Sequence, residues 1–189
     1  LAPFASGSLR DSAGVVFTGL PASTEEISRL KGRVLIDENA TKNIFLQLSN
    51  RYDIIHLATH ASVNNDTPSH SYIAFYPGNN DYKLYAGEIA DLKLDAVQLV
   101  ILSACETALG DVKGSEGVFG LQRAFKMAGV KKMIVSLWQV PDKETAELMT
   151  IFYSYWMKGK TIEEAFYQAQ GEMRKKYAPF YWAAFVLVE

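Results

Sequence analysis

The chain of 189 residues contains a single cysteine, Cys105, so no internal disulfide can form. A chain without disulfides is typical of a reducing compartment, and we expect a cytoplasmic protein. The formal net charge is only -2 and no block of like charge occurs, so nothing favours direct contact with nucleic acid or with an anionic membrane. No apolar run approaches the ~20 residues that span a bilayer, and we expect no membrane partner.

The start of the chain lacks an initiator methionine and also lacks the charged and apolar regions of a signal peptide. Its apolar opening residues suggest that it continues from a preceding segment, and residues 2–4 could be the end of a strand that begins upstream. With 49% apolar residues the chain is large enough to bury one core. We therefore expect residues 1–189 to form one domain, the C-terminal part of a longer polypeptide.

Short apolar runs alternate with longer segments of helical period, which is typical of an α/β domain with a mostly parallel sheet. The predicted helices begin near residues 23, 41, 118, 142 and 161, and the third of them ends at Gly129. The predicted strands are Val15–Phe17, Val34–Ile36, Asp53–Thr59, Val97–Ser103, Lys132–Trp138 and Tyr181–Val188.

Several helix starts carry capping residues. Ser23 with Glu26 has the spacing of a capping box, and Thr161 with Glu164 has the same spacing. Asp142 is the predicted N-cap of its helix. Between the third and fourth strands, two alternating runs within residues 72–85 flank a turn sequence at 77–80, which predicts a small β-hairpin.

Two residues with chemical potential follow buried strands. The strand before His60 and the strand before Cys105 both lose their apolar character at these positions. Because the carboxyl ends of parallel strands meet at one edge of a sheet, neighbouring strands would bring the two side chains together across ~5 Å.

A histidine beside a thiol can accept its proton and raise the thiolate fraction, which is the arrangement of a cysteine nucleophile with a histidine base. We expect the backbone N–H groups of Ala61 and Cys105, just past the strands, to stabilise an oxyanion. No third residue that orients His60 is evident in the sequence, so we predict a dyad.

Structural alternatives exist for each of these residues. A lone cysteine is often a small core side chain. His56 shares a strand face with His60 by the two-residue period, and it is interpreted as a hydrogen-bonded core histidine. A zinc site formed by His56, His60, His70 and Cys105 is disfavoured, because four-residue spacing along a strand separates the rings too far for tetrahedral coordination. We expect no metal and no cofactor.

Five blocks resemble the CHAT family, a caspase-like domain commonly fused to tetratricopeptide repeats. They are YDIIHLATHA at 52–61, LSACETALG at 102–110, GSEGV at 114–118, SLWQVPD at 136–142 and YWAAFVLV at 181–188. The resemblance covers the chain from about Leu20 onward. It implies a caspase and separase type fold, with a mostly parallel sheet between layers of helices, and upstream tetratricopeptide-type repeats in the native chain.

The same resemblance implies peptide-bond hydrolysis through a thioester on Cys105, with His60 as general base and acid. Ala61 stands where the family usually has glycine. The stretch from Trp138 to Asp142 is similar to one in separases in which acidic residues help to select a basic residue before the cut. Trp138, Asp142 and Glu106 are therefore candidate substrate-binding residues, with the alternative that Asp142 only caps its helix.

The leading hypothesis is a cysteine endopeptidase that acts on a protein substrate. An inactive caspase-like domain retained as an interaction or scaffold module is the alternative from a different class. An amidase that uses the same dyad on a small molecule is a third.

Overall fold

The computed structural model describes residues 1–28, 32–64, 66–78, 81–103, 105–106 and 116–189, with backbone alone for residues 105–106 and 116–119. A central four-stranded sheet has the order β10-β9-β7-β3. Strands β3, β7 and β9 run parallel and β10 pairs antiparallel with β9. The strands span Ile54–Leu57 (β3), Leu99–Leu102 (β7), Lys132–Ser136 (β9) and Phe185–Val188 (β10).

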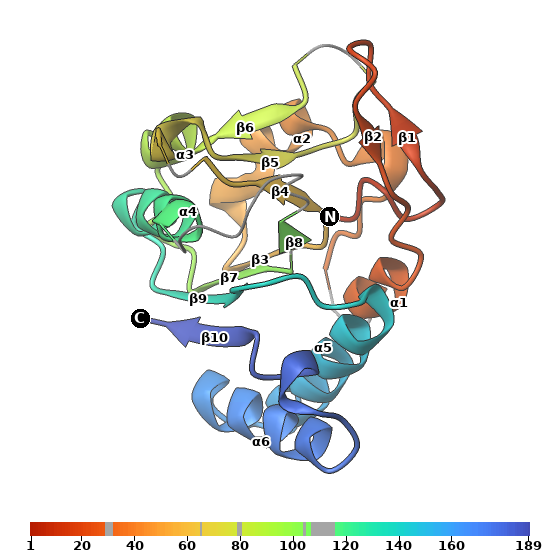
Figure 1. The fold of residues 1–189 in the computed structure, drawn as a ribbon. Helices are drawn as coiled ribbons and strands as arrows, with labels where there is room; N and C mark the ends of the chain where they lie inside the picture. The colour runs from red at the N-terminus through yellow and green to blue at the C-terminus, as the bar shows by residue number, and fades with distance from the viewer. Residues whose placement is uncertain (29–31, 65, 79–80, 104, 107–115) are drawn as a thin grey trace.

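The central sheet is covered by helices on both faces (Figure 1). On β7, Val100 and Leu102 pack into one cluster with residues of α2, α3 and α4, whereas Leu99 and Ile101 pack with α5 and α6. This alternation is what the two-residue period of a strand requires when both faces are buried. The result is the expected caspase-like three-layer sandwich. The helices span Ser23–Ser28 (α1), Lys42–Leu48 (α2), Ala86–Ala90 (α3), Glu116–Met127 (α4), Asp142–Trp156 (α5) and Ile162–Arg174 (α6).

A second four-stranded sheet has the order β6-β5-β4-β8 and carries the two candidate catalytic positions. Strands β5 and β6 form the antiparallel hairpin that the turn sequence predicts. Strand β4 follows β3 along the chain, and β8 follows β7. The strands span His60–Ser62 (β4), Tyr72–Ala74 (β5), Lys83–Tyr85 (β6) and Cys105–Glu106 (β8).

The local predictions have mixed outcomes. The capping box of Thr161 with Glu164 is present, and Gly129 follows α4 with a φ of 99°, in the left-handed region that a helix end favours. Residues 34–36 do not form the predicted strand, because only Ile36 makes a bridge, to Ala2. The sequence analysis also missed the short helix α3 and four 3₁₀ turns, Asp37–Asn39, Ser49–Arg51, Pro68–His70 and Pro179–Tyr181.

An N-terminal hairpin lies beside the second sheet. Strands β1 (Leu9–Arg10) and β2 (Val16–Phe17) pair antiparallel, and Phe4 and Phe17 pack with Ala74 and Tyr82 in a separate buried cluster. Among the described residues, no helix is both long and apolar enough to cross a membrane.

Candidate functional site

His60 and Cys105 occupy paired positions on neighbouring parallel strands. Strand β4 pairs with β8 in the register that sets His60 opposite Cys105 and Ala61 opposite Glu106. Paired residues of adjacent strands have backbones ~5 Å apart. The structure therefore brings together the two positions that the sequence analysis placed at one sheet edge, although the Cys105 side chain lies outside the described part.

The two positions start new strands, which differs from the prediction. Strand β3 ends at Leu57 and β7 ends at Leu102, and pairing resumes at His60 and Cys105. Ala61 and Cys105 lie past β3 and β7 as expected, but they belong to new paired strands, Ala61 to β4 and Cys105 to β8. Their assignment as oxyanion donors remains a prediction.

The imidazole of His60 is buried, with 4% of the residue exposed. The rings of Phe4 and Phe17 lie 4.8 and 5.7 Å from it, centroid to centroid. Both phenylalanines belong to the N-terminal segment that includes the β1–β2 hairpin. Aromatic rings therefore restrict the orientation of the histidine on the side of this segment.

Thr18 determines the tautomer of His60. The Nε2 atom of His60 lies 2.8 Å from the Thr18 carbonyl oxygen. A carbonyl only accepts hydrogen bonds, so Nε2 carries a proton and donates it to Thr18. Burial lowers the pKa of His60 and outweighs the opposing effect of this hydrogen bond. The neutral ring therefore has Nδ1 as its basic nitrogen at neutral pH.

A pocket of about 210 Å³ opens beside His60. Its walls come from the segment after β2, from α1, from the breaks that follow β3 and β7, and from residues 139–141 with the start of α5. Glu26 and Asp142 both line this pocket, and no lysine or arginine is among the described residues that line it. The pocket is therefore acidic without a compensating cation on its wall.

Asp142 lies at the first position of α5, but it does not cap this helix. The N-cap position is Pro141 and no side chain caps the helix there. Instead, Asp142 Oδ2 accepts a 2.6 Å hydrogen bond from the Ala22 N–H, immediately before α1. The prediction that Asp142 caps its helix is therefore wrong. Burial raises the pKa of the Asp142 carboxyl, and the negative charge of Glu26 raises this pKa further.

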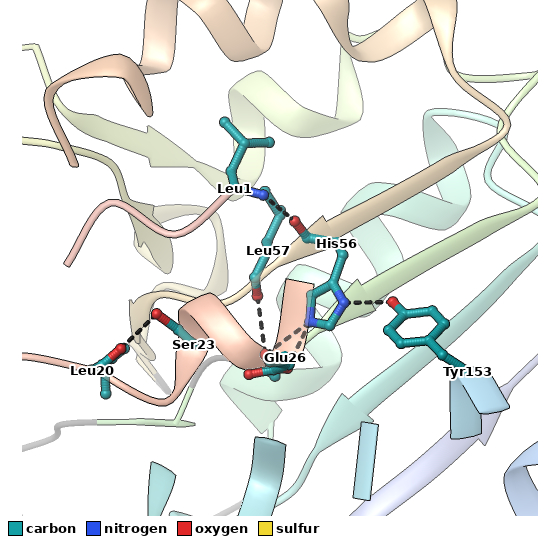
Figure 2. A network of polar contacts seen from close by, with 8 residues as sticks. Leu1, Leu20, Ser23, Glu26, His56, Leu57 and Tyr153 are labelled. Carbon is teal, nitrogen blue, oxygen red and sulfur yellow. Dashed lines mark hydrogen bonds and ion pairs between the residues drawn. The ribbon is translucent and has the colours of Figure 1, made fainter. Parts of the chain in front are cut away.

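Glu26 belongs to a buried polar network that includes His56 (Figure 2). His56 Nε2 donates to Glu26 Oε1 at 2.6 Å, and the Tyr153 hydroxyl lies within hydrogen-bond distance of His56 Nδ1, at 2.5 Å. Ser103 Oγ lies 3.2 Å from the same Nε2. The predicted capping box of Ser23 with Glu26 is therefore wrong, since Ser23 donates to the Leu20 carbonyl and the Glu26 carboxylate faces His56. His56 is the hydrogen-bonded core histidine that the sequence indicates.

Two further candidates lie in different surroundings. Trp138 donates its Nε1 hydrogen to the Phe180 carbonyl at 2.9 Å and is not among the residues that line the pocket beside His60. Glu106 follows Cys105 in β8, and its side chain lies outside the described part. Of the three candidate substrate-binding residues, the pocket therefore includes Asp142.

Sequence reasoning missed three residues that define the site: Thr18, Glu26 and Ser103. Thr18 acts through its backbone, which leaves no signal in the residue type. The spacing of Glu26 from Ser23 fits a capping box, so the sequence did not identify Glu26 as a residue of the site. Ser103 is two residues before Cys105 in the predicted motif, and its contact with a strand histidine depends on the register of β3 with β7.

Comparison with known proteins gives a consistent result. The chain is 26% identical over 210 aligned positions to tetratricopeptide repeat protein 28 of Mus musculus, and equally to the protein of that name from Homo sapiens. These alignments cover 89% of this chain but only 8% of each relative, so the chain spans a small part of their length. The family model of the CHAT domain matches residues 4–189. With this match over nearly the whole chain, and with a caspase-like sandwich as its fold, the protein belongs to the CHAT domain family.

Proposed function

We propose that the domain is a cysteine endopeptidase in which Cys105 is the nucleophile and His60 the general base and acid. The observation that carries the proposal is the pairing of these two residues on adjacent strands. The tautomer of His60 supports it, because Nδ1 of a neutral ring can accept the proton of a thiol. A buried imidazole with a lowered pKa stays unprotonated at neutral pH, as a base must.

The reaction runs in two halves. His60 takes the proton from Cys105, the sulfur attacks the peptide carbonyl carbon, and the C–N bond breaks as His60 returns the proton to the leaving amine. The acyl group is then bound to sulfur as a thioester. A water molecule, deprotonated by His60, attacks the thioester carbon, the C–S bond breaks, and His60 returns the proton to the Cys105 sulfur as the acid product leaves. The backbone N–H groups of Ala61 and Cys105 are the proposed donors to the oxyanion in both halves.

The acidic pocket beside His60 suits a lysine or arginine side chain of the substrate. Asp142 and Glu26 repel each other across this pocket, which contributes to the raised pKa of Asp142. A guanidinium or ammonium group would relieve this repulsion and gain charge-assisted hydrogen bonds. We therefore expect cleavage after a basic residue.

The chain is proposed to act as the peptidase part of a longer polypeptide. Its relatives are named for tetratricopeptide repeats and are much longer than the matched region. Such repeats, placed upstream of the domain, would present a protein substrate to it. A reducing compartment such as the cytoplasm suits a catalytic thiol.

The experiment uses the fact that Cys105 is the only thiol of the chain. A peptide electrophile with an arginine before its reactive group is added, and intact mass spectrometry measures the rate of adduct formation. We expect labelling at least about tenfold faster than that of free glutathione, with no adduct on Cys105→Ala and a slow rate on His60→Gln. Labelling at the glutathione rate, unchanged by His60→Gln, would exclude the dyad.

The burial of His60 also favours a second candidate, an inactive module that binds another protein. In that case Cys105 would label slowly, and the domain would bind its partner without any new N-terminus appearing in it. Proteomic comparison of N-termini generated by the full-length protein and by its Cys105→Ala form separates the two functions.

A further inference from the structure

The two strand pairs of the site are interrupted at matched positions. Pairing of β3 with β7 stops at Leu57 and Leu102, and pairing of β4 with β8 starts at His60 and Cys105. We call residues 58–59 the β3–β4 break and residues 103–104 the β7–β8 break. The position of each candidate catalytic residue therefore depends on the contacts that hold the break before it.

The base has anchors of its own. Thr59, in the β3–β4 break, donates its hydroxyl hydrogen to the Ala74 carbonyl at 2.5 Å. His60 donates to the Thr18 carbonyl, and β4 pairs with β5 as well as with β8. The contacts with Ala74, Thr18 and β5 do not involve β8, so they hold the base independently of the nucleophile.

Strand β8 receives less support from the sheet. It consists of Cys105 and Glu106 and lies at the edge of the second sheet, where its neighbour in the described part of the chain is β4. A pairing this short is only marginally stable by itself. The residues that lead into β8 must therefore contribute to fixing Cys105 opposite His60.

Ser103 is anchored in the β7–β8 break by its backbone and by its side chain. Its N–H donates to the Leu57 carbonyl at 3.1 Å. Its hydroxyl lies 3.2 Å from His56 Nε2 and 3.5 Å from the same carbonyl. Ser103 is only 6% exposed, so water competes little for these contacts. The hydroxyl thus connects the break to the last two residues of β3.

His56 gives this hydroxyl a fixed partner. The side chain of His56 is 1% exposed and lies between Glu26 of α1, at 2.6 Å, and Tyr153 of α5, at 2.5 Å (Figure 2). A buried network of this kind has few alternative arrangements, because each polar group would lose its partner if it moved. Through His56, the β7–β8 break is therefore connected to two helices of the domain.

We propose that Ser103 is a positioning residue for Cys105. Its hydroxyl, held by His56, fixes the β7–β8 break and thereby places the nucleophile opposite the base. This inference rests on the proposed function, because it assigns Ser103 a role in the same pair of catalytic residues. Ser103 takes no part in the bond changes of the reaction, since it acts through the backbone that it holds.

The labelling rate of Cys105 tests this role, with Tyr153→Phe as the control. Ser103→Ala and Tyr153→Phe each remove a hydroxyl that contacts His56, but Tyr153 lies on α5, outside the β7–β8 break. We expect Ser103→Ala to react with the arginine electrophile at least about tenfold more slowly than the parent, and Tyr153→Phe within about twofold of it. Urea unfolding measures the stability of each variant. If the labelling rates followed the losses of stability, Ser103 would have a structural role alone.

Ser103→Thr is the conservative variant, because it keeps the hydroxyl. Its added methyl group can enter the pocket that Ser103 lines. We expect Ser103→Thr to label within about threefold of the parent rate. A rate as low as that of Ser103→Ala would show that the hydroxyl is not what places the nucleophile.

A disulfide provides a readout that does not use the proposed reaction. His60→Cys sets a second thiol on the position paired with Cys105, and paired backbones ~5 Å apart lie within the range that a disulfide bridges. Oxidised glutathione is the oxidant, and intact mass spectrometry follows formation of the bond. We expect this rate to fall at least about tenfold when Ser103→Ala is added and to stay unchanged when Tyr153→Phe is added.

Equal disulfide rates in the three proteins, or no disulfide in His60→Cys, would overturn the positioning role of Ser103. Slow labelling of Cys105 in the parent would instead count against the peptidase. In that case the disulfide rates would still decide whether Ser103 places Cys105.

Discussion

The His60 imidazole donates from Nε2 to the carbonyl of Thr18, a residue 42 positions earlier in the chain, at 2.8 Å. The proposed dyad thus has an orienting partner on the backbone of the N-terminal segment. Because this partner is a carbonyl without ionisable protons, it sets the tautomer of His60 and leaves the second nitrogen free to act as a base.

The pH dependence of Cys105 labelling follows from the lowered pKa of His60. The imidazole should stay neutral below the ordinary value of ~6.5, so His60-assisted labelling should persist at pH 6.5 and decline only in more acidic solution. The measurement is the labelling rate by mass spectrometry between pH 5 and 8, with His60→Gln as the reference. A midpoint above pH 6.5 would contradict the assignment.

The lowered pKa of His60 also predicts how this residue affects the free energy of unfolding at different pH values. Its folded pKa lies below the unfolded one, so the unfolded chain binds more protons. The contribution of His60 is therefore fully present above pH ~6.5 and is lost as the pH falls toward the folded pKa. Urea unfolding of the parent and of His60→Gln checks this, and the parent should lose more stability between pH 7 and pH 5. A parallel decline in both proteins would count against the shift.

Asp142→Asn should change selectivity without loss of stability at neutral pH. The raised pKa means that the folded state binds protons more readily than the unfolded state, so ionised Asp142 opposes folding as the pH rises above ~3.8. An asparagine oxygen can still accept from Ala22. We expect kcat/KM for arginine substrates to fall at least about tenfold, since a carboxylate contact is lost.

The control for this change is Glu144→Gln, which removes the same charge in the first turn of α5 at a residue that does not line the pocket. It should leave selectivity between arginine and leucine substrates unaltered. If both variants reduced arginine cleavage equally, the effect would come from overall charge and the pocket would have no specific role.

Tyr153→Phe should destabilise the domain by about 1–3 kcal/mol, because His56 Nδ1 would be buried without its hydrogen-bond partner. Removal of a hydroxyl from Tyr167, which is 63% exposed, should change the free energy of unfolding by less than about 0.5 kcal/mol. Chemical denaturation of Tyr153→Phe and Tyr167→Phe measures both. Similar values for the two would mean that the network around His56 contributes little to stability.

Gly129→Ala should be more destabilising than Gly159→Ala. Both glycines have positive φ, 99° and 89°, and an alanine there costs about 1–2 kcal/mol from backbone strain. At Gly129 the added Cβ would also lie 2.6 Å from Asp95 Oδ1, whereas at Gly159 it meets nothing within 4 Å. Thermal unfolding compares them, and equal losses would show that the Asp95 loop moves aside freely.

The sequence predicts those parts of the fold that follow from the spacing of apolar residues along the chain. The buried runs of β3, β7 and β9 and the cap of α6 are local signals, and each was confirmed. The role of residues 34–36 could not be predicted, because a single bridge to Ala2 replaces a strand there. Contacts between segments far apart in the chain, such as Glu26 with His56, require the register of the sheet and of the packed helices.

The candidate site was predictable at the level of the two strand positions. The acidic pocket was not, since its second carboxylate comes from α1 and appeared to belong to a helix cap. Asp142 was a candidate substrate-binding residue because the stretch from Trp138 to Asp142 is similar to one in separases. Its hydrogen bond with Ala22 depends on the packing of α1 near the start of α5. Such pairings leave no spacing pattern in a single sequence.

The first eighteen residues have a consequence for anyone who shortens this domain. The motif resemblance begins near Leu20, and a fragment cut there would retain every recognisable sequence block. It would lose Phe4, Phe17 and the Thr18 carbonyl, and with them the aromatic packing around the imidazole and the acceptor of its Nε2 hydrogen. The inactivity of such a fragment would result from the truncation, and it would not show whether the intact domain is an enzyme.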